Sequence, residues 1–264
     1  MAGSGSVKSR VPEEKTSTLR EFRNRQTVWI VTDPFEAPGR AAGLPDAVIA
    51  EKWLEACLNG DNPTSGRAPT RTETLANNQP KIHIRRSLHG GWLGPLWRGY
   101  RAGLGRLKSE IELTARLHAA GAPVPEPAFI IAKRDGILWR AAFCTVHIED
   151  AVDAIRFLQS GPQNATLQNA AQAAGRAVAN LHRLGLRHGD LHLGNLLIRE
   201  QQPDCQAWVI DLDGSHLGPP LSAKEKRRQL DRLCRSLKKR GLIDRCGPEA
   251  QSAFLEGYSA ACSD

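Results

Sequence analysis

The stretch RHGDLHLGN at residues 187–195, followed by WVID at residues 208–211, decides how this chain is interpreted. It places Asp190 and Asn195 five positions apart in a polar segment, and a second carboxylate, Asp211, directly after an apolar run. A carboxylate can accept a proton from a hydroxyl group, and carboxylate and amide oxygens are ligands that Mg²⁺ accepts. The three side chains are therefore candidates for a catalytic base and a metal site.

Enzymes that transfer phosphoryl groups in the kinase fold use this set of groups in this order. The spacing of His188, Asp190 and Asn195 matches the catalytic-loop pattern H-x-D-x-x-x-x-N, with Gly189 where protein kinases usually carry Arg. Asp211 then matches the metal-binding carboxylate of that pattern. The pattern predicts a kinase-type site.

The flanking sequence is needed to exclude ordinary turn chemistry, which Asp, Asn and Gly often serve. Residues 166–186 carry apolar side chains at intervals of three or four, as one face of a helix requires. Residues 196–198 and 207–210 have the pattern of two short strands joined by a turn that contains Pro203. The order of helix, polar loop, strand pair and metal carboxylate favours a kinase-type site over a structural turn.

The composition is that of a globular protein, with 264 residues, 41% hydrophobic residues and a formal charge of +8. No apolar stretch approaches the roughly 20 residues needed to span a bilayer, and residues 1–6 lack the apolar centre of a signal peptide. These features predict a cytosolic protein. The six cysteines form no C-x-x-C pair, which predicts free thiols. The charge favours anionic partners, but the basic residues lack the interleaved aromatics of nucleic-acid binders, so no nucleic-acid partner is predicted.

The order of predicted elements indicates an α+β fold with two lobes, like that of protein kinases. The first half is rich in strands around one helix, and the second half is mostly helical and carries the polar loop. We expect a poorly ordered N-terminus over residues 1–25, an N-lobe over 26–147 and a C-lobe over 148–264, with a nucleotide between the lobes. The strands expected in the N-lobe are 27–31, 81–85, 128–132 and 136–146, and the expected helices are 44–59 and 106–120.

Five segments of the chain form a characteristic set: GRA at 66–68, IRRSLHGG at 84–91, GAPVPEP at 121–127, HGDLHLGN at 188–195 and RLCRSLKK at 232–239. Together they resemble a known family, the bacterial lipopolysaccharide kinases (Kdo/heptose kinases), and in particular their 3-deoxy-D-manno-octulosonic acid (Kdo) kinase branch. The catalytic loop alone is shared with many small-molecule kinases, whereas the segments at 84–91, 121–127 and 232–239 are more specific to the Kdo kinase branch.

The resemblance implies ATP as the phosphate donor, Mg²⁺ as the metal, and a lipid-linked sugar of the lipopolysaccharide inner core as the acceptor, with Kdo on a lipid A precursor the expected sugar. It implies that Asp190 is the catalytic base and that Asn195 and Asp211 are the metal ligands. It leaves open whether Asp213, where kinases carry Gly, assists the metal or is a solvated turn residue. His188 is expected to brace the loop backbone.

The resemblance also implies that a cation on the third strand of the N-lobe is paired with a helix acid and holds the phosphates. The cation falls best on Arg85, with Arg86 and Lys81 as alternatives. Arg grips phosphate differently from the Lys of protein kinases, because its donors form a planar fork. The residues expected to bind ATP are Gly66, Arg67, Arg85, Glu110, Val146 and Ile148.

The segment 224–240 is the most basic in the chain. We expect a helix there whose apolar face is formed by Leu230, Leu233, Cys234 and Leu237. Its cations either form a solvated surface or meet the anionic lipid substrate and the membrane surface. With the second interpretation, the protein would lie peripherally on the cytoplasmic face of the inner membrane. The sequence does not indicate an oligomeric state.

Two other functions fit parts of this pattern. One is a different small-molecule or protein kinase, of the aminoglycoside or RIO type, since the catalytic loop does not specify the acceptor. The other is a kinase-fold binding module with little catalysis, which the glycine-poor phosphate loop and the strand Arg would suit. The presence of Asp190, Asn195 and Asp211 together argues against a pure binding module.

Overall fold

The computed structural model describes residues 18–56, 70–75, 79–86, 100–201 and 204–263. They form two compact units, which are treated separately below. The first unit consists of described residues up to His118 together with Pro125–Ile148. The second unit consists of Ala119–Val124 together with the described residues from Glu149 onward.

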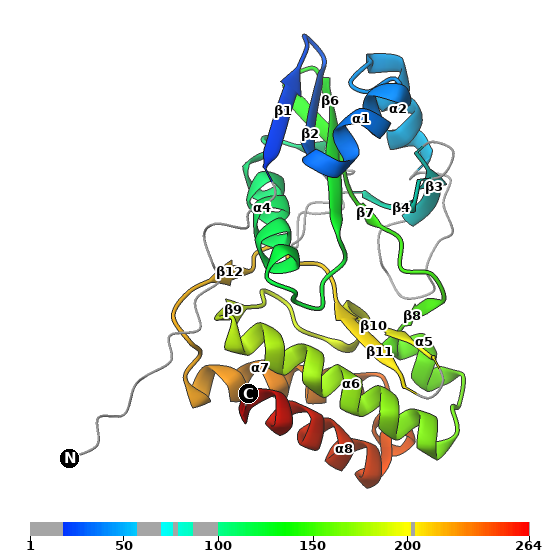
Figure 1. The fold of residues 1–264 in the computed structure, drawn as a ribbon, viewed down its shortest axis with the longest axis vertical. Coiled ribbons are helices and arrows are strands. Elements are labelled where there is room, and N and C mark those ends of the chain that lie inside the picture. The colour runs from blue at the N-terminus through cyan, green and yellow to red at the C-terminus, as the bar shows by residue number, and fades with distance from the viewer. Residues whose placement is uncertain (1–17, 57–69, 76–78, 87–99, 202–203, 264) are drawn as a thin grey trace, which may run out of the picture. The chain divides into compact units, whose positions relative to one another are not determined.

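An antiparallel sheet of seven strands forms the first unit, in the order β1-β2-β6-β7-β4-β3, with β5 also paired to β7 (Figure 1). Three helices accompany it: α1 (Asp33–Ala41), α2 (Ala47–Ala56) and α4 (Gly105–Ala119). The strands are β1 (Leu19–Arg23), β2 (Thr27–Thr32), β3 (Thr70–Thr74), β4 (Lys81–Arg86), β5 (Tyr100–Arg101), β6 (Pro127–Asp135) and β7 (Leu138–Val146).

Both faces of this sheet are covered, and β2 shows why its sequence is apolar throughout. Successive side chains of a strand point to opposite faces. Trp29 and Val31 pack in the core that includes residues of α1 and α2. Val28 and Ile30 pack on the other face, in the core that includes Leu107 of α4. A strand with helices on both faces has no side for water, so TVWIVT carries no charge.

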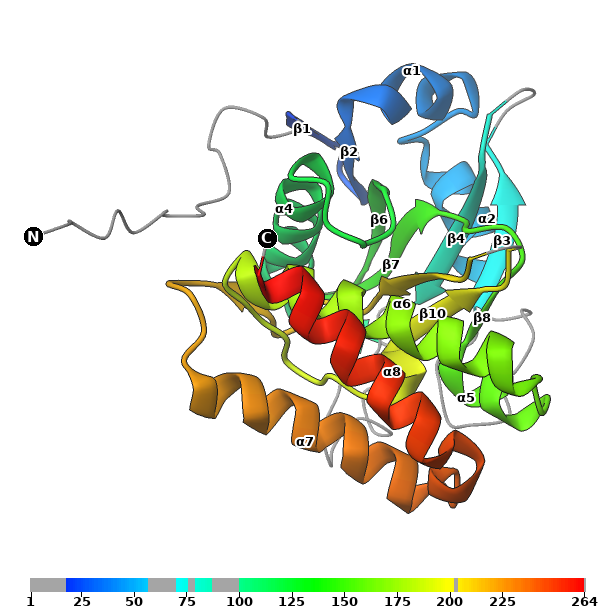
Figure 2. The ribbon, with the colours of Figure 1, turned by 60° about the horizontal axis from the view of Figure 1, so that its bottom comes forward.

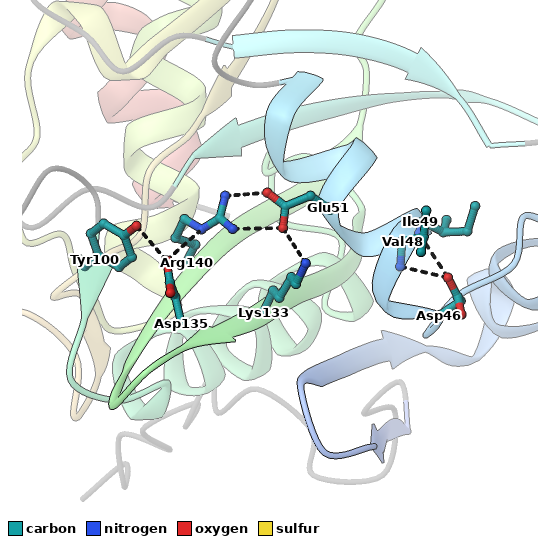
Figure 3. A network of polar contacts seen from close by, with 8 residues as sticks. All are labelled: Asp46, Val48, Ile49, Glu51, Tyr100, Lys133, Asp135 and Arg140. Atoms are coloured by element: carbon teal, nitrogen blue, oxygen red, sulfur yellow. Dashed lines mark hydrogen bonds and ion pairs between the residues drawn. The ribbon is translucent and has the colours of Figure 1, made fainter.

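Polar contacts fix α2 against the sheet (Figure 3). Asp46 caps the helix, because its carboxylate accepts the backbone N–H groups of the second and third following residues at 2.8 and 3.2 Å. One turn later, Glu51 receives both Arg140 of β7 and Lys133 of β6, at 2.6 and 2.8 Å. These bonds hold the pKa of Glu51 below its ordinary value although burial opposes them.

Two elements of the first unit differ from the sequence expectation. Leu19–Arg23 falls in the stretch expected to be poorly ordered, but it forms β1 and pairs with β2 along its length. Its signal was weak because only Leu19 and Phe22 are apolar. Asp33 and Pro34 directly follow β2 and begin α1, a helix that the sequence analysis did not predict. Pro suits the first turn of a helix, where its missing N–H has no partner to lose.

The second unit is mainly helical, with α5 (Ala154–Gln159), α6 (Asn164–Arg183), α7 (Ala223–Lys239) and α8 (Ile243–Ser263). Its strands are short and antiparallel. They form one sheet in the order β11-β10-β8 and one β12-β9 pair. Their bounds are β8 (Ala151–Asp153), β9 (Leu186–Arg187), β10 (Leu196–Arg199), β11 (Gln206–Val209) and β12 (His216–Leu217).

Helices α6 and α8 lie side by side in both views (Figures 1 and 2). Glycine allows their backbones to approach closely. A methyl group at Gly175 would lie 2.1 Å from the carbonyl oxygen of Phe254, and one at Gly257 would lie 2.2 Å from that of Gln172. Of this pair, α6 packs against β10 and β11, and β10 directly follows the polar loop. Among the described helices, none combines the length and the apolarity needed to cross a bilayer.

Candidate active site

Side chains fold the polar loop between β9 and β10 so that Asp190 and Asn195 are fixed relative to each other. The side-chain amide of Asn195 donates to the carbonyl oxygen of Asp190 at 2.9 Å. The backbone of Asn195 in turn accepts the N–H of Ile210 at 2.9 Å, which joins the loop to the end of β11. Asn195 is buried, whereas the Asp190 side chain is 77% exposed. The structure therefore presents the predicted base to solvent from a firmly held loop.

Asp211 follows directly on Ile210, so the same backbone bond brings it next to Asn195 in the fold. Its backbone lies in the left-handed region, with φ of 62°. Such conformations are costly for residues other than Gly and occur where the surrounding structure enforces them, often at functional sites. Two residues before Asp211, Val209 donates its N–H to the carbonyl oxygen of Pro123 at 2.8 Å. The proline-rich connector thus anchors the strand that leads to Asp211.

Asn195 and Asp211 fit a Mg²⁺ site by their chemistry. The amide nitrogen of Asn195 is engaged by Asp190, so its Oδ1 is the atom that could ligate a metal. Asp211 adds a carboxylate. Oxygen ligands of this kind suit Mg²⁺, which usually takes one or two protein oxygens together with water and substrate phosphates. Both residues predicted as metal ligands are therefore brought together in one unit.

His188 braces the loop, as predicted from its place before Asp190. Its Nε2 donates to the carbonyl oxygen of Ile210 at 3.2 Å, and its Nδ1 accepts the N–H of Asp190 at 3.1 Å. These roles require the neutral ring with its proton on Nε2. Burial lowers the pKa of His188, which favours the same neutral form. The ring therefore supports the backbone on both sides of the site and is not itself a metal ligand.

His192 occupies the next turn of the loop. Its Nδ1 accepts the N–H of Gly194 at 3.0 Å and so caps the short 3₁₀ turn η2 (Leu193–Asn195). This leaves the Nε2 proton on the other side of the ring, and that nitrogen lies 3.6 Å from Oδ2 of Asp190. His192 therefore supports the turn that carries Asn195, and its Nε2 faces the carboxylate of Asp190.

Gly189, where protein kinases usually carry Arg, has no room for a side chain. A methyl group at this position would lie 2.7 Å from the carbonyl oxygen of Asp213 and 3.0 Å from the carbonyl carbon of Gly214. Its N–H donates to the hydroxyl of Ser215 at 2.9 Å. The turn after Asp211 therefore packs directly on the backbone of the loop. The role of the Asp213 carboxylate stays a prediction.

The first unit carries the predicted pair of a strand cation and a helix acid. Arg85 of β4 donates to Glu110 of α4, and the arginine also lies 5.4 Å from the centre of the Phe143 ring. Glu110 is only 4% exposed. Alternation along β4 explains why Arg85 and not Arg86 reaches it, since Ile82 and Ile84 point into the opposite core.

The remaining residues predicted to bind ATP are less informative. Gly66 and Arg67 lie outside the described residues. The N–H of Val146 donates to the carbonyl oxygen of Glu126 at 2.8 Å, so in this conformation it is engaged within the unit. Ile148 is half-buried at the end of the same unit. Their roles stay predictions.

Sequence reasoning missed a set of contacts from α7 to the loop. Gln229 accepts the N–H of His188 at 3.2 Å, Arg232 donates to the carbonyl oxygen of Gly189 at 2.7 Å, and Ser236 accepts the N–H of Leu193 at 3.4 Å. The apolar face predicted for this helix was partly wrong. Leu233 is buried, but Cys234 is exposed because it lies on the far side of the helix.

Comparison with known proteins identifies the family. A family model described as the lipopolysaccharide kinase (Kdo/WaaP) family matches residues 63–258. The chain belongs to this family. It is 33% identical over 186 residues to the 3-deoxy-D-manno-octulosonic acid kinase of Vibrio vulnificus strain YJ016. The aligned region covers 67% of this chain and 75% of that protein. The enzyme of the same description from Vibrio parahaemolyticus is 28% identical over 227 residues, covering 84% and 88%.

A solved structure, that of WaaP in complex with acyl carrier protein, has a similar fold. The TM-score is 0.54 at 20% sequence identity, with 88% of each chain covered. The predicted α+β, protein-kinase-like fold is thus confirmed, as is the resemblance to lipopolysaccharide kinases. As a member of this family, the protein is a phosphotransferase with an alcohol group as acceptor.

Proposed function

We propose that this lipopolysaccharide kinase transfers the γ-phosphoryl group of ATP to a hydroxyl of Kdo on a lipid A precursor. The observation that carries the proposal is the joined arrangement of Asp190, Asn195 and Asp211 in one loop system. In the kinase reaction, positioning and charge neutralisation supply most of the rate. The loop offers both, with an exposed carboxylate for the acceptor and two oxygen ligands beside it.

Asp190 would orient the sugar hydroxyl and accept its proton late in the transfer. The carboxylate is mostly exposed, so it can reach an incoming acceptor, while the bonds of His188 and Asn195 to its backbone hold it in one orientation. Asn195 and Asp211 would bind Mg²⁺, which supplies positive charge to the phosphates when it is bound. Removal of Asp190 should therefore abolish turnover while ATP binding persists.

ATP itself would be held mainly by the first unit. Arg85, kept in place by Glu110, would contact the non-transferred phosphates, because a guanidinium can donate two parallel hydrogen bonds to phosphate oxygens. Gly66 and Arg67 would cover the phosphates, and the segment from Val146 to Ile148 would meet the adenine. These assignments follow the family motif residue by residue.

Kdo as the acceptor is supported by the two relatives described as Kdo kinases, at 33% and 28% identity. A panel of acceptors with labelled ATP tests it: a Kdo-bearing lipid A precursor, a heptosylated core, an aminoglycoside and a protein. Label on the Kdo acceptor with at least tenfold preference is expected. Transfer mainly to the heptosylated core would retain the lipopolysaccharide kinase activity and overturn the choice of Kdo.

The outer side of α7 would meet the anionic surface in which such a substrate sits. Exposed cations occur at Lys224, Arg227, Arg228, Arg235 and Lys238, and none of them has a carboxylate partner among the residues that the structure describes. Figure 2 shows α7 apart from the α6–α8 pair along most of its length. Each cation near an anionic lipid surface contributes about 1 kcal/mol of attraction.

Vesicle binding tests this surface role. The protein should bind vesicles more tightly as their anionic lipid content rises, and Arg228→Glu with Arg235→Glu should remove most of that dependence. Arg176→Glu, at an exposed arginine on α6, serves as a control for a single charge reversal away from α7. Binding that ignores anionic content would contradict recruitment through α7.

A further inference from the structure

Helix α7 presents a polar stripe to the catalytic loop. Glu225, Gln229, Arg232 and Ser236 follow one another at intervals of four, three and four residues. At 3.6 residues per turn they fall within roughly 60° of the helix circumference. Each of the four makes a hydrogen bond to a residue of the loop or to Arg187 just before it. The stripe is separate from the exposed cations on the outer side.

Two of these contacts reach the backbone directly before Asp190. The N–H of His188 is held by Gln229 at 3.2 Å, and the carbonyl oxygen of Gly189 is held by Arg232 at 2.7 Å. The second bond fixes the peptide group that joins Gly189 to Asp190. That loop has no strand partner to hold its backbone between β9 and η2, so side chains must satisfy its polar groups.

The helix is anchored where the stripe begins. Ser222 and Glu225 form a capping box, and Glu225 also accepts the guanidinium of Arg187 at 2.8 Å. Hydrogen bonds from Ser222 and the ion pair with Arg187 lower the pKa of Glu225 to about 2. The carboxylate is thus charged at any working pH, and it ties the start of α7 to the residue that precedes the loop.

We infer that Arg232 and Gln229 are positioning residues, which set the orientation of Asp190 through the loop backbone without touching a reactant. Gln229 is 6% exposed, so its amide is committed to the protein interior. The guanidinium of Arg232 donates to the carbonyl oxygen of Gly189, and its positive charge makes this hydrogen bond stronger than one between two neutral groups. This role deepens the proposed kinase reaction and rests on it for its kinetic test only.

Kinetics of Arg232→Ala test the inference. A small misplacement of a catalytic group costs on the order of 100-fold in rate. We therefore expect kcat to fall about 10- to 100-fold, with KM for ATP within about threefold of the native value because the phosphate contacts proposed for the first unit are unchanged. Arg232→Lys, which keeps a cationic donor, should recover part of kcat. Arg176→Ala, the control on α6, should retain full activity.

Hydrogen exchange tests the same inference without any acceptor. In Arg232→Ala and Gln229→Met, amide exchange should accelerate in residues 187–195, while α7 itself and the α6–α8 pair keep native protection. Faster exchange throughout α7 would indicate a purely structural role and overturn the inference, as would native exchange in the loop. If exchange changes as expected but no acceptor is phosphorylated, the choice of substrate fails and the positioning role stands.

Discussion

Replacing Arg85 by Met removes the positive partner of a buried carboxylate. Glu110 is 4% exposed, and its partner Arg85 has a side chain that is 24% exposed. Breaking a buried ion pair from one side costs about 3–5 kcal/mol, because it leaves an uncompensated charge in the interior. Water reaches this pair from the arginine side, so we expect about 2–3 kcal/mol for Arg85→Met. In a protein of this size that corresponds to a Tm lower by roughly 5–10 °C.

Urea unfolding of four variants measures this loss of free energy and shows whether it comes from the pair of Arg85 and Glu110. Arg85→Met should lose the stated free energy of unfolding. The double variant Arg85→Met with Glu110→Leu should regain most of it, since two apolar side chains leave no buried charge. Arg86→Met, on the alternate face of β4, should lose less than half as much as Arg85→Met. Glu110→Leu alone should also be destabilised, because the guanidinium of Arg85 then loses its carboxylate partner.

Two results would refute the reasoning. The first is an Arg85→Met variant within about 0.5 kcal/mol of the native protein, a change typical of surface sites without special contacts. The second is a double variant as unstable as the sum of the single ones, which would mean that the two side chains are not coupled. Either result would remove the structural basis for assigning the strand cation to Arg85.

Three further predictions concern the second unit. Burial lowers the pKa of His182 to about 4, so this residue should not reduce the free energy of unfolding above pH 6.5. Between pH 6.5 and pH 4 the unfolded state binds a proton that the folded state does not, and the free energy of unfolding should fall by about 1.4 kcal/mol per pH unit. His182→Gln should flatten this slope in urea titrations. Gly189→Ala should cost more than tenfold in kcat, because the added methyl group meets backbone at 2.7 Å; native kcat would contradict the close approach. Asp211→Asn should keep Tm within about 3 °C, since Asn tolerates a φ of 62°, and lose about 100-fold in kcat; retained activity would exclude Asp211 as a metal ligand.

The catalytic loop was the part of the site that the sequence predicted best, and the reason is local. Asp190, Asn195 and their turn are close in the chain, and Asp211 follows the next strand, so fixed spacing carries the geometry. The pair of Arg85 and Glu110 was predictable from the sequence only in part. The family resemblance favoured Arg85, but the choice over Arg86 needed the packing of Ile82 and Ile84 into the opposite core.

The role of α7 was not predictable in the same way. Its leucines suggested a docked apolar face, and its cations suggested a charged surface. The contacts of Gln229 and Arg232 are to backbone groups more than 40 residues earlier in the chain, which leave no complementary residue type in the sequence. The four-three-four spacing of polar residues was the available signal. Helix α1 was missed for another reason, because Pro34 suits both the end of a strand and the start of a helix.

The most direct test of the account is phosphoryl transfer from labelled ATP to a Kdo-bearing lipid A precursor, measured in the presence of Mg²⁺ for the native protein and for Asp190→Ala. The native protein should label the sugar, and Asp190→Ala should bind ATP with native affinity but transfer at a rate lower by about three orders of magnitude or more. Equal transfer by both proteins would contradict the central claim that the loop at residues 187–195 performs the reaction.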